Sequence, residues 1–443
     1  MRVYIKTYGC QMNERDSEAI AAALTAAGHT VIDREEGADA MLFNTCSVRE
    51  AAERKAKGKI SYMRKLKRER PELILGVMGC MAQRLGDELF RELPHLDFVL
   101  GTGQLHTLVP LLESIAADRR QVSRIAASSE VLTQLGGHTA APDCRGQIAI
   151  TRGCNRVCSY CIVPYVRGRE ISRPSGDIIA EAKEMTASGV REILLLGQNV
   201  AAYGLGGNTS PPEPGHSPFA ELLEALAELP DLYRIRFTSP YITYFNDRLI
   251  STLSSTPKVC NQLHLPLQSG SDRILRAMNR QYTASGYLDK VAQLKAAIPD
   301  LALSTDVIVG FPGEEEEDFD KTREVMERVG FDQAYVFKYS PRPGARSAEM
   351  ADSVPDAVKQ RRNAILLDDL ARRVSAKLRG CVGKTVEVLV EGVSARNAAR
   401  WSGRTTTNVT VHFEPVPGLA PGQLRQIKVT RANEVTLVGE VQG

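Results

Sequence analysis

The chain has 443 residues, of which 43% are hydrophobic and 25% are charged, an ordinary composition for a folded protein of about two to four domains. Its longest apolar runs are far too short to cross a bilayer, which excludes a protein built on membrane-spanning helices. The formal net charge of +3 is too small to indicate a nucleic-acid partner by itself.

The first residues predict a β-strand rather than a signal peptide, because polar and apolar side chains alternate up to Gly9. No lipidation pattern is present either, so we expect no membrane attachment and a cytoplasmic location. The chain has nine cysteines. In a reducing compartment these are more readily metal ligands or buried residues than disulfides.

The first domain, residues 1–120, repeats one unit: an apolar strand, a polar turn with a cysteine, then a helix. The cysteines are Cys10, Cys46 and Cys80, separated by 36 and 34 residues, each about one strand–helix–strand crossover. We expect Asn13 to cap the first helix and Gly28 to end it. Such units form a parallel sheet, whose carboxyl edge would gather the three cysteines. The expected strands are 3–5, 41–43 and 73–78, and the expected helices are 14–27, 51–67 and 83–92.

A linker over 121–146 leads to a second α/β series over 147–375. Six strand–helix units without a seventh and eighth predict a partial (βα)6 barrel. The expected strands are 148–151, 192–196, 234–237, 262–265, 304–309 and 333–337. A basic helix follows over 357–378, and short strands with turn signals over 378–443 predict a small antiparallel β-barrel. From Lys359 onward there are 14 Lys/Arg and 7 Asp/Glu, which fits a phosphate-facing surface or a solvated helix face equally well.

A cysteine triplet opens the second series: Cys154, Cys158 and Cys161, spaced CxxxCxxC. Thiolates are the protein ligands of 4Fe-4S clusters, which normally take four. Three would leave one iron for the amino and carboxylate groups of S-adenosylmethionine. An electron passed to the bound sulfonium would then break its C–S bond and give a 5′-deoxyadenosyl radical.

The alternative is a structural zinc site with Cys144 or His138 as the fourth ligand. Zinc sites usually pair cysteines in two CxxC knuckles, which this spacing does not do. Here the sequence resembles the radical S-adenosylmethionine superfamily. In that superfamily an aromatic residue before the third cysteine packs near the adenine, and Tyr160 matches it.

Cys10, Cys46 and Cys80 form the second candidate cluster site. Each alone is more often a buried small residue. Three cysteines at equivalent turns are different. Each lies beside tight-turn residues and a helix start, and this arrangement favours an anionic iron–sulfur cluster.

With both triplets in view, nearly the whole chain resembles the methylthiotransferase family, including its C-terminal TRAM-type barrel. The matching strings of the tRNA-modifying MiaB-type branch are 6–13, 44–49, 163–170, 196–199 and 338–344. One departure is Thr238–Tyr241, where relatives more usually carry a His-Pro pair.

The resemblance implies replacement of a C–H bond by C–SCH3 at carbon 2 of the isopentenylated adenosine beside the tRNA anticodon. It implies two 4Fe-4S clusters, with the one at Cys10, Cys46 and Cys80 holding the transferred sulfur. One S-adenosylmethionine would methylate that sulfur and a second would supply the radical. An external electron donor, a supplier of sulfur or clusters, and a monomeric state are also expected.

Smaller motifs lie just past the ends of candidate strands, where a barrel presents its active site. We expect cofactor contacts from Gln198, Asn199, Gln268 and Ser269. Asp306 is either a buried hydrogen-bonded residue or a site residue. The acidic run Glu314–Asp318 is expected to be a solvated helix start.

Contact with RNA is expected from Arg167 and Arg169, which follow the cluster loop, because a modified base must be unstacked and held. In the barrel, Arg400, Trp401 and Arg404 form either a stacking platform with phosphate contacts or a plug with exposed charges. The competing functions are methylthiolation of a ribosomal-protein aspartate or of threonylcarbamoyl-adenosine in tRNA, and a non-catalytic, metal-stabilised RNA-binding protein.

Overall fold

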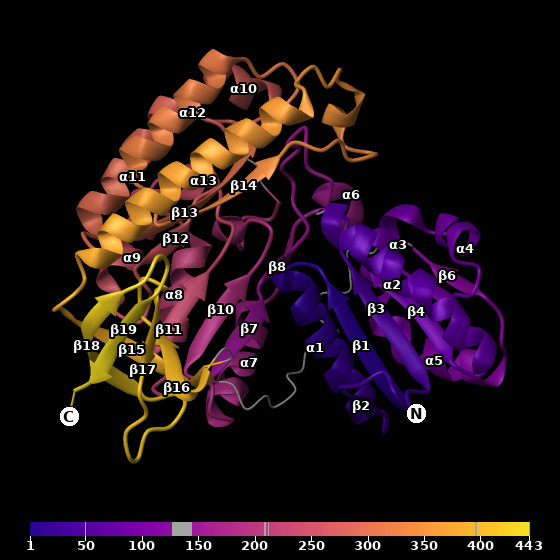
Figure 1. Ribbon diagram of the computed structural model, residues 1–443. Coiled ribbons are helices and arrows are strands. Elements are labelled where there is room, and N and C mark those ends of the chain that lie inside the picture. The colour runs from indigo at the N-terminus through magenta and orange to yellow at the C-terminus, as the bar shows by residue number, and fades with distance from the viewer. Residues whose placement is uncertain (49, 126–143, 208–209, 211, 395–396, 443) are drawn as a thin grey trace.

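The protein forms three domains in a row, seen in the computed structural model of Figure 1. The structure describes residues 1–48, 50–125, 144–207, 210, 212–394 and 397–442. Within these ranges no helix is both long and apolar enough to cross a membrane. An N-terminal sheet domain faces a central domain of six strands, and a small barrel follows at the C-terminus.

The N-terminal domain is a six-stranded sheet in the order β2-β1-β3-β4-β5-β6, with every neighbouring pair parallel, as predicted. Apolar residues fill both of its faces against the helices. Its strands are β1 (Arg2–Tyr8), β2 (Thr30–Ile32), β3 (Ala40–Thr45), β4 (Ile74–Gly79), β5 (Phe98–Leu100) and β6 (Val122–Arg124). Its α-helices are α1 (Gln11–Ala26), α2 (Glu50–Glu69), α3 (Cys80–Leu85), α4 (Glu88–Glu92) and α5 (Leu108–Ala117).

Three details of this domain differ from the prediction. Asn13 is not the cap of α1: the helix begins at Gln11, Cys10 is its N-cap, and Asn13 Oδ1 accepts a hydrogen bond from the Cys10 amide at 3.3 Å. The expected helix over 83–92 is two helices, because Gly86 has a φ of 51°. Strand β6 lies within the expected linker and pairs with β5.

The central domain confirms the partial barrel of six parallel strands. Two three-stranded sheets, β7-β10-β11 and β12-β13-β14, are joined by a single bridge between Ile235 and Val259. The strands are β7 (Arg145–Ala149), β10 (Glu192–Leu196), β11 (Arg234–Phe237), β12 (Gln262–His264), β13 (Ala302–Val309) and β14 (Gln333–Lys338). A short hairpin pairs β8 (Thr151–Arg152) with β9 (Ile171–Ser172).

Helices cover the outer face of these strands and enclose a continuous apolar core (Figure 1). They are α7 (Ser175–Ala187), α8 (Pro218–Ala227), α9 (Asp247–Ser255), α11 (Ala284–Ala297), α12 (Glu316–Val329) and α13 (Asp356–Arg379). Two shorter helices lie apart from this core: α6 (Val163–Arg167) packs against Cys80 of the N-terminal domain, and α10 (Asp272–Ala277) packs against Phe311 and Tyr339.

The C-terminal domain is a closed five-stranded barrel in the order β15-β16-β17-β19-β18. The predicted small barrel is confirmed: its pairs are antiparallel except β17 with β19, which is parallel. Arg236 of β11 holds the barrel to the central domain by donating to the carbonyls of Thr405 and Thr406 at 2.6 and 2.9 Å. The strands are β15 (Thr385–Ser394), β16 (Asn397–Arg404), β17 (Thr410–Phe413), β18 (Leu424–Ala432) and β19 (Leu437–Val441).

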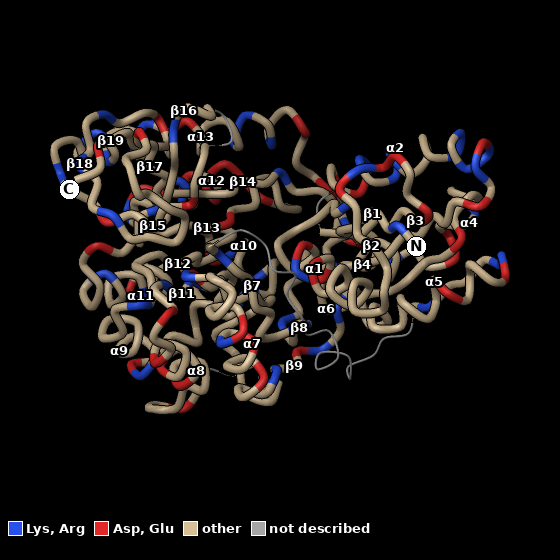
Figure 2. The backbone as a smooth tube through the Cα atoms, turned by 90° about the horizontal axis from the view of Figure 1, so that it is seen from below, with Lys and Arg blue, Asp and Glu red and all other residues tan. Residues whose placement is uncertain are grey.

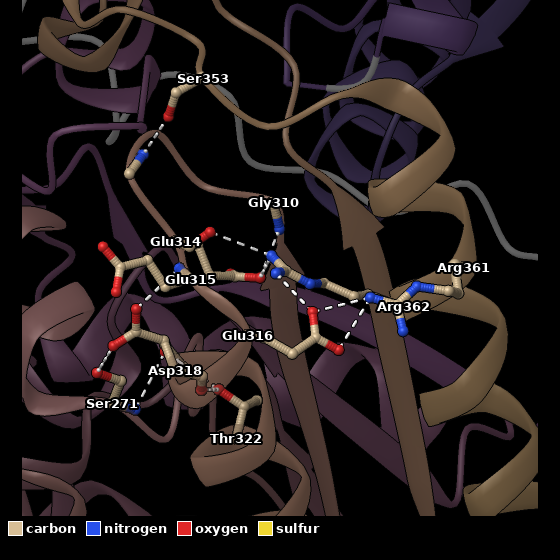
Figure 3. Close-up of polar contacts among 12 residues, drawn as sticks. Ser271, Gly310, Glu314, Glu315, Glu316, Asp318, Thr322, Ser353, Arg361 and Arg362 are labelled. Atoms are coloured by element: carbon tan, nitrogen blue, oxygen red, sulfur yellow. Dashed lines mark hydrogen bonds and ion pairs between the residues drawn. The ribbon is translucent and has the colours of Figure 1, made fainter.

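The acidic run at the start of α12 is only partly solvated (Figure 3). Glu315, Glu316 and Glu317 are exposed, as expected for a solvated helix start. The expectation was wrong for Glu314 and Asp318, which are buried and paired. The side chains of Glu314 and Arg362 are 2% and 4% exposed, with Arg362 Nη1 at 2.7 Å from Glu314 Oε1. Asp318 accepts a hydrogen bond from the Ser271 hydroxyl at 2.6 Å. Burial raises the pKa of Glu314 although Arg362 opposes it. Helix α13 is therefore fastened to the central domain by buried charge.

Other basic side chains of α13 are also paired with acids. Arg361 contacts Glu316 at 2.8 Å, and Lys377 contacts Asp332. Basic and acidic positions are interspersed in all three domains (Figure 2). This pairing favours a structural explanation for the basic helix over a phosphate-facing one.

Replacing Arg362 by alanine should lower the free energy of unfolding by about 3–5 kcal/mol, because it leaves the buried Glu314 carboxylate without its cation. The matched control is Arg361→Ala, which removes a pair whose partners are 52% and 51% exposed and should cost about 0–1 kcal/mol. Urea unfolding followed by circular dichroism measures both. Equal losses in the two variants would contradict the assignment.

Candidate functional site

One cavity, with a volume of about 300 Å³, lies between the N-terminal and central domains. It is lined by all six cysteines of the two triplets, Cys10, Cys46, Cys80, Cys154, Cys158 and Cys161. The N-terminal cysteines reach it because β1, β3 and β4 end together: Tyr8 pairs with Thr45, and Thr45 with Gly79. The carboxyl edge of the sheet thus carries three turns to one place.

A buried hydrogen-bond network fixes these three turns relative to one another. Asn13 Nδ2 donates to Asn44 Oδ1 at 3.0 Å, and Asn44 Nδ2 donates to the backbone carbonyl of Asn13 at 2.8 Å. Thr45 Oγ1 then donates to the Met78 carbonyl at 2.7 Å. Gly79 has a φ of 96°, and a Cβ there would clash with Asn44, so glycine is required where the chain turns toward Cys80.

The central triplet is held on a loop fastened to the end of α10. The Ser159 amide donates to the Met278 carbonyl at 3.0 Å, and the Ser159 hydroxyl donates to the Ala277 carbonyl at 2.9 Å. Asn279 Nδ2 donates to the Val157 carbonyl at 2.9 Å. The loop therefore presents three thiols to the cavity from a fixed backbone.

The chemistry of these thiols fits iron–sulfur ligation. Burial raises the pKa of Cys80 and Cys154 to about 11 and that of Cys161 to about 12. Thiols in this environment give up their protons when metal binds, because the metal stabilises the thiolate.

Within the described ranges, no three His, Cys, Asp or Glu side chains lie close enough to hold a single metal ion. The thiolates of a cube-shaped cluster each bind a different iron and stand further apart. Of the zinc ligands considered above, Cys144 donates to the Val390 carbonyl at 3.3 Å and is not part of the cavity wall. His138 lies outside the described residues.

Most of the predicted cofactor contacts line the cavity: Tyr160, Gln198, Asn199, Gln268 and Asp306. Gln198 Oε1 is buried and has no hydrogen-bond partner among the residues described, so it is available to a donor on a bound molecule. Asp306 also contacts His264 Nε2 at 3.2 Å. The exception is Ser269, which is 1% exposed, contacts the Thr322 hydroxyl at 3.2 Å and lies outside the cavity lining.

Sequence reasoning missed a stack of charged and aromatic side chains in the cavity wall. The ring of Tyr241 lies between two guanidinium groups, Arg156 at 4.2 Å and Arg280 at 4.3 Å from its centroid, both within cation–π range. Arg280 Nη1 also donates to Cys158 Sγ at 3.5 Å. Tyr241 ends the string that departs from the usual His-Pro pattern, which was the one available signal.

Of the residues expected to contact RNA, Arg167 and Arg169 lie in different surroundings. The side chain of Arg167 is 3% exposed, lines the cavity and contacts Asp16 at 3.1 Å, whereas Arg169 is exposed. Trp401 is partly buried against the barrel core. Arg404 contacts Glu391 at 2.9 Å, and Arg400 is half-buried.

Buried ion pairs join the two halves of the cavity. Asp16 of α1 accepts hydrogen bonds from Arg152 and Arg167 of the central domain. One residue away, Arg15 contacts Glu181 at 2.5 Å, and Glu181 also binds Arg173 at 2.6 Å. Beside these pairs, Met12 packs with Ala149 and Leu196.

Three family matches follow the three domains in order. Residues 2–101 match Uncharacterized protein family UPF0004, residues 148–326 match the Radical SAM superfamily, and residues 379–441 match the TRAM domain. With the partial barrel and its CxxxCxxC loop, these matches define a radical S-adenosylmethionine protein with an additional N-terminal domain and a TRAM barrel.

Curated relatives match along the whole chain. One from Akkermansia muciniphila is 43% identical over 99% of this chain and 98% of its own length, and one from Opitutus terrae is 44% identical over 99% and 97%. Both are named tRNA-2-methylthio-N(6)-dimethylallyladenosine synthase. The chain belongs to this family, and the resemblance inferred from the motifs is confirmed.

Solved structures share the fold at low sequence identity. The radical S-adenosylmethionine methyltransferase TsrM from Kitasatospora setae, with cobalamin and a 4Fe-4S cluster bound, superposes with a TM-score of 0.57 at 11% identity. The match covers 78% of this chain and 77% of that one. The cobalamin-dependent enzyme OxsB superposes with a TM-score of 0.52 at 12% identity over 85% and 56%.

Anaerobically reconstituted protein should contain about eight iron and eight sulfide per chain, as two 4Fe-4S clusters require. Cys10→Ala and Cys158→Ala should each lose about half of both, because each variant removes one ligand of a different triplet. Cys381→Ala, a half-buried cysteine outside the cavity, is the matched control and should retain the full content. Zinc without acid-labile sulfide would contradict the assignment.

Proposed function

We propose that the chain is a tRNA methylthiotransferase. Its reaction replaces the hydrogen on carbon 2 of the N6-isopentenyladenosine beside the anticodon with a methylthio group. The observation that carries this proposal is the shared cavity. Both cysteine triplets line it, so a base held there would lie between a radical source and a sulfur source. The substrate is inferred from the names of the full-length relatives.

Two 4Fe-4S clusters would be held, one by Cys154, Cys158 and Cys161 and one by Cys10, Cys46 and Cys80. When bound, the first supplies the electron that cleaves S-adenosylmethionine to a 5′-deoxyadenosyl radical, and the second supplies the sulfur, methylated by a second S-adenosylmethionine.

The protein's own residues bind and orient the reactants. Gln198 and Asp306 offer polar groups to S-adenosylmethionine, and Tyr160 offers an apolar contact within the same wall. The Arg156–Tyr241–Arg280 stack fixes the cavity wall beside Cys158. Bound substrate between the two domains would limit the access of water, which protects a radical from side reactions.

The tRNA would present an unstacked base to the cavity, with Arg169 and the barrel residues Arg400, Trp401 and Arg404 on the path of the surrounding RNA. Arginine side chains that reach the surface bind phosphates, and an aromatic ring gives a stacking surface. Arg169 is exposed, whereas Arg400, Trp401 and Arg404 are half-buried. Each turnover consumes an electron and a sulfur atom, so an external reductant and a supplier of sulfur or clusters are required. The chain is proposed to act as a monomer, because its own two domains complete the cavity.

A deletion strain should lose methylthio-isopentenyladenosine from its tRNA, and the wild-type gene should restore it. Cys10→Ala and Cys158→Ala should restore none, while Cys381→Ala should restore it fully. Mass spectrometry of digested tRNA measures the nucleoside.

Unchanged methylthio-isopentenyladenosine in the deletion strain would contradict the proposal. Loss of methylthio-threonylcarbamoyl-adenosine, or of a methylthio-aspartate in a ribosomal protein, would indicate the corresponding branch instead. In purified form, Cys10→Ala should still cleave S-adenosylmethionine and Cys158→Ala should not. Equal cleavage by both would refute the division of roles.

A further inference from the structure

A buried arginine lies on the N-terminal side of the cavity without a full set of partners. The side chain of Arg167 is 3% exposed and lines the same cavity as Cys10 and Cys80. Its Nη2 contacts Asp16 Oδ2 at 3.1 Å. Its Nη1 is buried and, among the described residues, has no hydrogen-bond partner.

An unpartnered guanidinium nitrogen in this position is costly, because a buried donor without an acceptor loses about 1–3 kcal/mol. The place of Arg167 is nevertheless set by packing. It is the last residue of α6, where Val166 and Ile162 pack against Cys80. The Thr102 hydroxyl donates to the Val166 carbonyl at 2.5 Å. The helix therefore carries a cation to the start of α3, where Cys80 stands.

We propose that Arg167 is the cation that offsets the negative charge of the cluster at Cys10, Cys46 and Cys80 and thereby raises its reduction potential. Three thiolates give such a cluster a negative charge that a buried site cannot leave uncompensated. Nearby charge and hydrogen bonds to sulfur are among the main protein determinants of cluster potential. The inference rests on the assignment of that cluster and is independent of the RNA substrate.

The charges around Arg167 support this role. Arg152 shares the Asp16 carboxylate and also donates to the Thr102 carbonyl at 3.0 Å, so Asp16 is divided between two cations. An arginine guanidinium is not deprotonated in proteins, and the Asp16 carboxylate beside it favours the charged form further. The guanidinium thus stays charged beside the sulfur ligands.

A raised reduction potential of the N-terminal cluster would favour the proposed reaction. When a carbon radical joins an anionic sulfur, the three electrons involved form one two-electron bond and leave one electron over. A neighbouring centre of higher potential accepts that electron more readily. Arg167 is thus a positioning and electrostatic residue rather than a catalytic one.

The test is a redox titration, monitored by electron paramagnetic resonance, of full-length protein in which Cys154, Cys158 and Cys161 are alanine, so that only the N-terminal cluster is present. Arg167→Gln should shift the reduction equilibrium about tenfold toward the oxidised cluster, which is about 59 mV for one electron. Arg169→Gln, an exposed arginine two residues away, is the matched control and should shift it far less. Arg167→Lys keeps the charge and should stay near the parent.

Asp16→Asn separates electrostatics from structural damage, because it removes a negative charge and should raise the potential instead. Shifts of the same sign in Arg167→Gln and Asp16→Asn would overturn the proposal, as would equal potentials in Arg167→Gln and Arg169→Gln. Loss of iron in Arg167→Gln alone, with iron retained in Arg167→Lys, would support the need for a charge. Loss of iron in both variants would indicate that Arg167 acts through packing, and would overturn the proposal.

Discussion

A buried carboxylate, Asp16, connects the two halves of the cavity. Asp16 stands on the first helix of the N-terminal domain and binds Arg152 and Arg167 of the central domain, with its own side chain 2% exposed. A buried carboxylate is tolerated only where cations and hydrogen bonds compensate it, so Asp16 must remain between the arginines. Together with the neighbouring Arg15–Glu181 pair, this contact helps to fix the two cysteine triplets relative to one another.

The N-terminal and central domains each bring three cysteines together, but by different structural means. In the N-terminal domain, strands that end in register bring three distant cysteines to one sheet edge, and the Asn13–Asn44 hydrogen bonds lock their turns. In the central domain, one loop carries all three cysteines and is fastened by Ser159 to the end of α10. Helix α6 begins just after Cys161 and ends at Arg167, so five residues link one triplet to the surroundings of the other.

The fold class was predictable from the sequence because strand and helix patterns are local. Strands β10 and β11 were predicted at their observed bounds, since β10 is a short apolar-rich run and β11 alternates charged and apolar residues. The pairing of Arg362 with Glu314 and of Arg167 with Asp16 was not predictable. Both join residues far apart in the chain, and charged runs read alone resemble solvated surface. The Asn13 cap was misplaced because Cys10, a residue rarely expected at that position, begins the helix. The six cysteines were found through their spacing, whereas Arg156, Tyr241 and Arg280 carry no spacing signal.

The central claim is that both clusters occupy one cavity. The most direct test compares electron paramagnetic resonance spectra of the fully reduced wild-type protein with those of Cys10→Ala and Cys158→Ala, each reconstituted under the same conditions. Two clusters in one cavity should couple magnetically, so the wild-type spectrum should be broadened or split relative to the sum of the two single-cluster spectra. A wild-type spectrum equal to that sum would contradict the account.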